Sequence, residues 1–430
     1  TPNPKPQTPN PKPQTPWCNQ KSINKIMASP NTIGLTFVLI FNIFFSGLLS
    51  VYVGGWADTF KKTYNTTTEI VNLTYTSYLF ALVIAGIPIN FVIHRFSSKW
   101  LFCITLLTYT LGGVLRLLVD ENIYFMHAGL FLSGLGAPVT FNCIYSFCNS
   151  NFTKKTALVL MSICNIFDPV GTMVGLLLPF LFIEDGWTDQ HVKKGLQRYQ
   201  FMLLAIFAVA LIASVLLLRG EGRETVDQAG DKEVGLAINQ NPSLAITNKV
   251  SLIEKPKVDI CRQYRILFSD PVYISMMLSS GLMFGSLGTI GGCLVQEVVI
   301  WGMDEKIGSY LAAYSVLIGL FGSIFYSLIL SEVRSQLMMS FIFQAISLGS
   351  CGFACYSMTQ KNQLMMYLAT GIYALTTYPA FMILIDQIGK LVGKSMELTG
   401  TSAVYSLSSI IMGTSLFFIG LISKDETEDQ

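Results

Sequence analysis

The chain has 430 residues, of which 51% are hydrophobic and only 13% are charged. A soluble domain needs more charge than this to cover its surface, so the composition excludes an ordinary soluble protein. The formal net charge of +2 is too small to predict nucleic-acid binding. Because there are three histidines and no His-Glu-x-x-His or Gly-x-Ser-x-Gly motif, we expect neither an enzyme nor a metal or other cofactor.

Residues 1–32 precede the first apolar stretch and form a proline-rich amino-terminal arm. Its first part repeats TPNPKPQ twice. Proline at every second or third position forbids a helix and favours extended polyproline II. We expect either a solvated spacer or an arm that docks on a partner protein.

Eleven apolar stretches follow, each roughly 20 residues or longer, which is the length of a transmembrane helix and about twice that of a barrel strand. In lipid every backbone group must be satisfied within the chain. We therefore predict an all-α membrane protein with about 11 transmembrane helices. The predicted spans are 33–54, 73–94, 100–119, 123–149, 157–183, 199–219, 271–299, 308–331, 337–358, 364–388 and 398–423.

One hydrophilic insert, residues 220–270, divides the spans into two groups. We expect a six-helix half over 33–219 and a five-helix half over 271–424. An acidic tail, 425–430, closes the chain. Within the insert, 260–268 mixes arginines with apolar residues, which predicts a short interfacial helix leading into the seventh span.

Lysine and arginine collect in the loops that follow even-numbered spans. Such loops stay on the side that is not translocated. The amino terminus and the central insert are therefore expected to face the cytosol or the mitochondrial matrix, in a multi-pass protein of the plasma membrane or the mitochondrial inner membrane. The residues that carry this pattern in the short loops are Arg95, Lys99, Lys154, Lys155, Arg334, Lys390 and Lys394.

Six spans, a long loop and five more spans form the layout of the major facilitator superfamily with its twelfth helix absent. A more specific pattern is carried by Gly134, Pro138, Lys154, Gly171, Gly175, Pro179, Val299-Ile300-Trp301 and Gly400-Thr401-Ser402. On these residues the chain resembles, over 33–423, the feline leukaemia virus subgroup C receptor-related family of choline, ethanolamine and haem-associated carriers. The resemblance implies two pseudo-symmetric halves with a solute site between them.

The sequence departs from that family at the positions that bind choline. There a Trp in the first span and a Tyr in the seventh surround the cation with ring faces. The matching residues here are Ser50 and Thr289, and the family glutamines match Pro169 and Ile411. Tyr52 is a candidate replacement for the missing Trp. We expect that this chain does not bind choline in the family's manner, or that it binds no solute.

Asp168 lies in the middle of the fifth predicted span, and a charge inside the membrane is costly and often functional. One interpretation is a proton or cation site that faces a central cavity beside Asn142 or Asn165. The other is a carboxyl group that hydrogen-bonds the backbone freed by Pro169, or that stays protonated. The predicted substrate-binding residues are Asp168, Asn142, Asn165, Tyr52 and Thr289.

Arg95 and Lys99 match the basic turn between the second and third spans, which in related carriers helps to lock the inward gate. We predict a gating role for both. Arg116, near the end of the third span, is expected to extend its charged end to the membrane interface. Gly171 and Gly175 predict close helix packing. Five tyrosines are candidates either for a cavity wall or for packing and lipid contact: Tyr109, Tyr145, Tyr373, Tyr378 and Tyr405.

Two functions remain open from the sequence. The first is a carrier of a small organic solute, which works in the lipid bilayer by alternating access. The second is a transport-inactive, transporter-derived subunit of a larger membrane complex, in which stable partner proteins cover the place of the twelfth helix.

Overall fold

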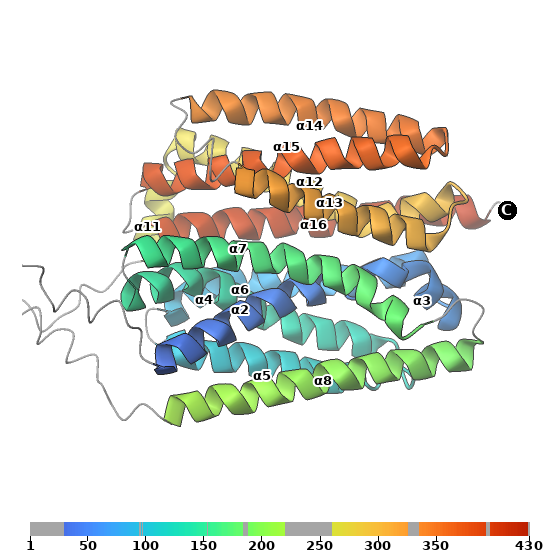
Figure 1. The fold of residues 1–430 in the computed structure, drawn as a ribbon, viewed down its shortest axis with the longest axis horizontal. Coiled ribbons are helices and arrows are strands. Elements are labelled where there is room, and N and C mark those ends of the chain that lie inside the picture. Colours follow the sequence, from blue (N-terminus) through green and yellow to red (C-terminus); the bar gives the residue numbers. More distant parts are fainter. Residues whose placement is uncertain are drawn as a thin grey trace, which may run out of the picture.

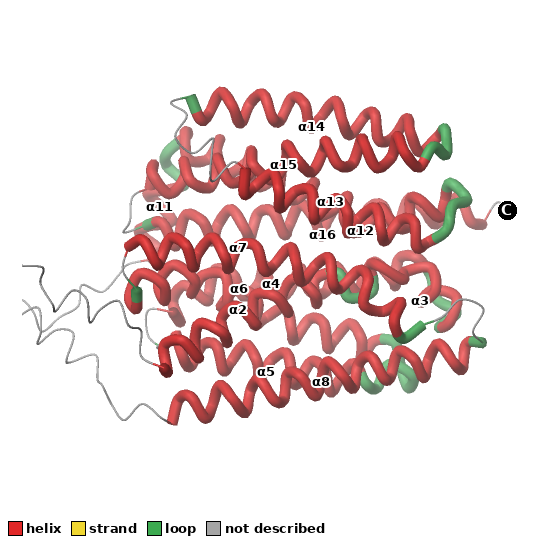
Figure 2. Tube along the Cα trace, in the orientation of Figure 1, coloured by secondary structure: helices red, strands yellow, loops and turns green. Residues whose placement is uncertain are grey.

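The computed structural model describes residues 30–93, 96, 98–152, 154–183, 188–219, 260–325, 335–392 and 396–428. The arm expected before residue 30 and the insert over 220–259 lie outside the described residues. The described part is helical, with no strand in it (Figure 2). Its elements are α2 (Pro30–Ser50), η1 (Gly54–Trp56), α3 (Ala57–Thr63), α4 (Thr68–Ile93), α5 (Ser98–Arg116), α6 (Tyr124–Asn151), α7 (Lys154–Leu177), η2 (Leu178–Leu181), α8 (Asp189–Arg219), α11 (Ile260–Leu267), α12 (Pro271–Ile300), α13 (Glu305–Phe325), α14 (Gln336–Thr359), α15 (Gln363–Val392) and α16 (Glu397–Glu428).

Eleven of these helices, all but α3 and α11, have at least 19 residues, which is consistent with the eleven predicted spans. Eight stretches of the described chain are both long and apolar enough to cross a membrane by themselves. The helices outside that group, α5, α6 and α7, pack within the same bundle against α8, α4 and α2. The expected short helix before the seventh span is present as α11.

The bundle consists of two halves with the same packing scheme (Figure 1). In the amino-terminal half α2 packs on α7, and α6 packs on both α4 and α5. In the carboxyl-terminal half α12 packs on α16, and α15 packs on both α13 and α14. The halves meet where α4 contacts α16 and where α7 contacts α13. The second helix of each half therefore faces the fifth helix of the other.

Small residues allow α2 and α7 to approach closely, as the glycine pattern predicted. A Cβ at Gly171 would collide with the carbonyl oxygen of Phe44, and one at Gly175 would lie 2.7 Å from that of Leu48. On the facing helix, a Cβ at Gly47 would collide with the carbonyl oxygen of Asp168. This backbone contact fixes the height and rotation of α7, and with them the position of Asp168 between the halves.

The outer face of the bundle is apolar, as expected of a surface in contact with lipid tails. In the amino-terminal half α8 covers one side of α5. Within the described residues no helix takes the equivalent place on α14, which packs mainly on α15. Its outward side chains are accordingly among the most exposed apolar ones: Met338 at 65%, Phe341 at 72% and Leu348 at 77%.

The prediction that Arg116 reaches the membrane interface is wrong. Its side chain is only 1% exposed and lies among helices of the amino-terminal half. The hydropathy pattern placed it near a span end, where long basic side chains commonly extend to water. Here the last turn of α5 is instead covered by neighbouring segments, including Gly129 of α6 and Tyr52.

Candidate functional site: a cavity between the two halves

A cavity of about 160 Å³ lies between the halves, which is where a rocking bundle exposes a site alternately to its two sides. Its walls come from α2, α4, α6 and α7 on one side and from α12, α13, α15 and α16 on the other. Besides aliphatic side chains, the lining residues include Ser46, Ser50, Tyr75, Tyr78, Phe141, Cys164, Asp168, Pro169, Thr172, Phe284, Ser315, Thr370, Tyr373, Tyr378, Phe381, Tyr405 and Ser409.

Aromatic rings make up much of this wall, and both halves supply them. Phe284 and Phe381 stack with ring centroids 4.4 Å apart. Phe141, from the amino-terminal half, stacks on Tyr405, from the carboxyl-terminal half, at 5.7 Å. Ring faces attract cations as well as apolar groups, so such a wall suits an organic cation better than an anion.

Asp168 is the only Asp, Glu, Lys, Arg or His among the described residues that line the cavity. Its carboxylate forms no hydrogen bond or ion pair with another residue that the structure describes. The alternative of a hydrogen bond to backbone freed by Pro169 is therefore not seen in this part of the chain. The side chain of Asn165 lies outside the described residues. The arrangement places one ionisable carboxyl group in a largely apolar, aromatic space.

The other predicted site residues lie away from the cavity wall. Tyr52 stacks on Tyr199 at 5.2 Å, within the core of the amino-terminal half. Thr289 donates a hydrogen bond of 2.8 Å to the carbonyl of Gly285 in its own helix and does not line the cavity. Asn142 lies between the cavity and the end of the bundle that carries α11.

Asn142 connects the two halves at that end. Its Nδ2 lies 3.3 Å from both Oδ1 of Asn90 and Oγ of Ser402. Ser402 Oγ donates to the carbonyl of Gly86 at 3.1 Å. Asn90 donates through Nδ2 to the hydroxyl of Tyr264 in α11 at 2.9 Å. Burial raises the pKa of Tyr264, so its hydroxyl stays protonated in this contact.

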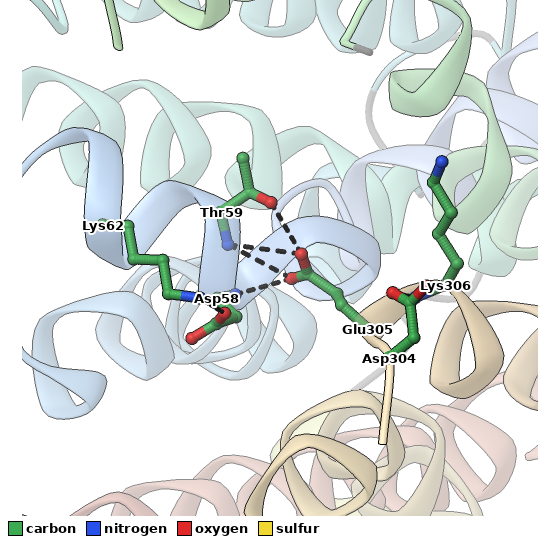
Figure 3. A network of polar contacts seen from close by, with 6 residues as sticks. All are labelled: Asp58, Thr59, Lys62, Asp304, Glu305 and Lys306. Carbon is green, nitrogen blue, oxygen red and sulfur yellow. Dashed lines mark hydrogen bonds and ion pairs between the residues drawn. The ribbon is translucent and has the colours of Figure 1, made fainter. Parts of the chain in front are cut away.

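Glu305 connects the halves at the opposite end, beside α3 (Figure 3). Its Oε1 accepts a hydrogen bond of 2.6 Å from the backbone N–H of Asp58. Its Oε2 accepts from the Thr59 hydroxyl at 2.7 Å and from the Thr59 N–H at 3.3 Å. The carboxylate thus caps the positive end of α3, although it belongs to the first residue of α13. Asp58 itself pairs with Lys62.

Two further contacts close this end. Ser309 donates to the carbonyl of Gly55 at 2.5 Å, and Gln296 donates to Oδ1 of Asn72 at 2.5 Å. Hydrogen bonds between the halves therefore cross the bundle on both sides of the cavity. These contacts oppose separation of the two halves at either end.

The predicted gate at the turn between α4 and α5 is only partly described. Arg95 lies outside the described residues. Lys99 lies in the first turn of α5, and its gating role stays a prediction.

The sequence did not predict the contacts of Glu305, because the loop Asp304-Glu305-Lys306 looks like an ordinary turn in which acidic and basic residues offset each other. The only sequence signal is an acidic residue at the start of a helix.

Three of the five candidate tyrosines, Tyr373, Tyr378 and Tyr405, line the cavity. Tyr109 does not, because it packs against Phe207 inside the amino-terminal half. The side chain of Tyr145 lies outside the described residues. Tyr75, on α4, was missed because nothing in its sequence context separates a cavity position from a lipid-facing one.

Comparisons with known proteins agree with this architecture. Among curated proteins no sequence match is significant. The fold is similar to that of a D-xylose–proton symporter, with a TM-score of 0.68, 10% identity and coverage of 90% of this chain and 89% of that chain. For the E. coli fucose:proton symporter the TM-score is 0.60 at 12% identity, and the match covers 92% of this chain and 93% of that chain. For a bacterial homologue of the human lysosomal transporter Spinster the TM-score is 0.61 at 13% identity, and the match covers 93% of this chain and 84% of that chain.

A family model matches nearly the whole described bundle, over residues 35–416, and its description is Major Facilitator Superfamily. This match agrees with the two repeated halves, the cavity between them and the absence of an enzymatic motif. The chain is therefore a multi-pass membrane protein that belongs to the major facilitator superfamily of secondary transporters.

Proposed function

We propose that this protein carries a small organic cation across the membrane by alternating access. The observation that supports the proposal best is Asp168, the one carboxylate among the described residues of a cavity whose lining is otherwise mainly aromatic, aliphatic and hydroxyl groups. A cation would be held by the carboxylate and by the ring faces of both halves.

The structural neighbours include a proton symporter of a sugar and a nucleoside transporter, which supports a secondary transporter without choosing its solute. A sugar needs many hydrogen-bonding groups at fixed positions, because its own hydroxyls lose water on binding. The described lining has no asparagine, glutamine, lysine or arginine. This lining favours a solute with one positive charge and an apolar body over a polyol.

Binding of a matched pair of probes tests the proposal in purified full-length protein. Choline and its uncharged tert-butyl analogue have the same shape and hydroxyl and differ in charge. Choline serves here as a probe of charge, not as the assigned substrate. We expect the protein to bind the charged probe more tightly. In Asp168→Asn this preference should fall by roughly ten-fold or more, because a hydrogen bond or contact to a charged group contributes about 1.5–3 kcal/mol.

Asp386→Asn is the matched control. It removes an equivalent carboxylate that lies outside the cavity and pairs with Lys390. The control should keep the preference of the unmodified protein. Equal binding of the two probes by the unmodified protein, or equal loss in both variants, would contradict the role of Asp168.

A second candidate, a structural subunit of a membrane assembly, is favoured by one observation. In the amino-terminal half α8 covers α5, but among the described residues no helix covers the outer face of α14 in the same way. A helix of a partner protein would fit there, as would lipid. Gentle extraction followed by size separation and mass spectrometry distinguishes the two. Stoichiometric co-migration with other proteins supports the subunit, and migration as a single species excludes it.

A further inference from the structure

A second polar site lies inside the amino-terminal half, outside the cavity. Its centre is the guanidinium of Arg116, in the last turn of α5, with 1% of the side chain exposed. Nη1 donates a hydrogen bond of 2.9 Å to Oγ of Ser133 on α6. The guanidinium carbon lies 5.2 Å from the ring centroid of Tyr52.

No carboxylate among the described residues balances this charge. The acid that follows α5, Asp120, instead accepts hydrogen bonds from Tyr64 at 2.8 Å and from Gln197 at 2.5 Å. A guanidinium keeps its proton at every physiological pH. An isolated buried charge has a large energetic cost unless it is paired and hydrogen-bonded. One hydroxyl and one ring face leave most of this cost without compensation.

Polar groups without hydrogen-bond partners in the described structure lie beside this guanidinium, on Tyr52 and Tyr199, and next to the Tyr52 hydroxyl, on Gln200. The hydroxyls of Tyr52 and Tyr199 and both amide atoms of Gln200 are buried, and none has a hydrogen-bond partner in the described structure. The exposed fractions of these three side chains are only 1%, 1% and 2%. Arg116 and Gln200 both lie near the Tyr52 hydroxyl, without hydrogen-bonding geometry. Each of the four side chains has at least one donor to offer.

We infer that Arg116, Tyr52, Tyr199 and Gln200 form a binding site for a small monovalent anion of the size of chloride. Such an ion accepts hydrogen bonds from several donors at once and cancels the buried charge. A water molecule would satisfy donors but leave the charge in place. The site joins the end of α5 and the segment after α2 to α8, so an occupied site stabilises this half of the bundle.

The test measures thermal unfolding of purified full-length protein at constant ionic strength, with chloride replacing gluconate. We expect the unfolding temperature to rise with chloride and to saturate, and bromide to act in the same way. Anomalous scattering from crystals grown in bromide should then place the ion beside Arg116. An unfolding temperature that is the same in chloride and in gluconate would overturn the inference.

Variants separate the site from a general salt effect. Arg116→Gln should abolish the chloride dependence. Because this variant can fail to fold, Tyr52→Phe provides a milder change that keeps the ring and removes one donor. It should raise the half-saturating chloride concentration by roughly ten-fold. The control is Tyr109→Phe, whose ring packs on Phe207; it removes another buried hydroxyl without a hydrogen-bond partner in the described part of the chain. An equal shift in the two phenylalanine variants would contradict the assignment.

Discussion

The carboxylate of Glu305 lies 2.6 Å from the backbone nitrogen of Asp58, although the two residues belong to opposite halves of the bundle. This contact joins α3, the short helix between α2 and α4 in the amino-terminal half, to the start of α13 in the carboxyl-terminal half. It breaks when the halves separate at that end. At the other end of the bundle, the hydrogen bond between Asn142 and Ser402 joins the two halves in the same way. The two sets of contacts predict separable effects on the two openings.

Glu305→Gln should open the end beside α3 more often. The amide can still accept a hydrogen bond, but it loses the charge that strengthens the contact with the N-terminus of α3, about 1–2 kcal/mol or roughly ten-fold in population. Cys164, a buried native cysteine on the cavity wall, reports the opening. Its alkylation by a membrane-impermeant reagent, added from this side and read by mass spectrometry, should accelerate.

The matched control for this experiment is Asp304→Asn. Asp304 precedes Glu305, and its side chain accepts a hydrogen bond of 3.1 Å from the N–H of Lys306 in its own segment. It should leave the labelling of Cys164 unchanged. If Glu305→Gln labels no faster than the control, the contact with α3 does not hold this end closed.

Ser402→Ala should have the mirror effect at the end beside α11. It removes an acceptor for Asn142 and a donor to Gly86, two neutral hydrogen bonds worth about 1 kcal/mol each. Labelling of Cys164 should rise several-fold when the reagent reaches the cytosolic or matrix side. Ser408→Ala is the comparison, since Ser408 bonds only within its own helix. Equal labelling in both variants would show that Ser402 is not part of the closure.

Phe284→Leu should weaken binding of a cation more than binding of its neutral analogue. The substitution keeps an apolar side chain and removes a ring face that stacks on Phe381. A cation–π contact contributes about 0.5–2 kcal/mol, which corresponds to roughly a 2- to 30-fold loss of affinity. Phe321→Leu, on the exposed face of α13, should change neither probe. A loss that is the same for both probes would mean that the ring provides only apolar contact.

Gly171→Ala should destabilise the protein by roughly 1–3 kcal/mol, because a Cβ there collides with the backbone of α2. Gly349→Ala, on α14, has no atom within 4 Å of the added group. It should be neutral or slightly stabilising, since alanine favours a helix more than glycine does. Thermal unfolding of the two variants checks the pair. Equal stabilities would show that the α2–α7 contact adjusts without cost.

The sequence was sufficient for the class of fold but not for the rotation of each helix. Runs of apolar residues predict where a span lies, and they placed the helix that carries Asp168 correctly. They do not say which side of that helix faces inward when all sides are apolar. Ser50 lines the cavity, whereas Tyr52, two residues later, turns into the core of the amino-terminal half. Neither residue differs from its neighbours in a way that predicts this.

Arg116 shows a second limit. Its distance from a span end predicts water contact, but the end of α5 is covered by α6 and by the segment after α2. Only contacts between residues far apart in the sequence decide this. The same holds for Glu305, whose partners lie 246 and 247 positions earlier. Charged and polar groups that act across the two halves were therefore the least predictable part of the site.

The most direct test of the central claim is uptake of a labelled organic cation by purified protein in proteoliposomes. The account predicts saturable uptake of at least one small quaternary ammonium ion, no matching uptake of its uncharged analogue, and loss of uptake in Asp168→Asn but not in Asp386→Asn. Flux no greater than that of empty liposomes, or flux that Asp168→Asn leaves intact, would contradict it.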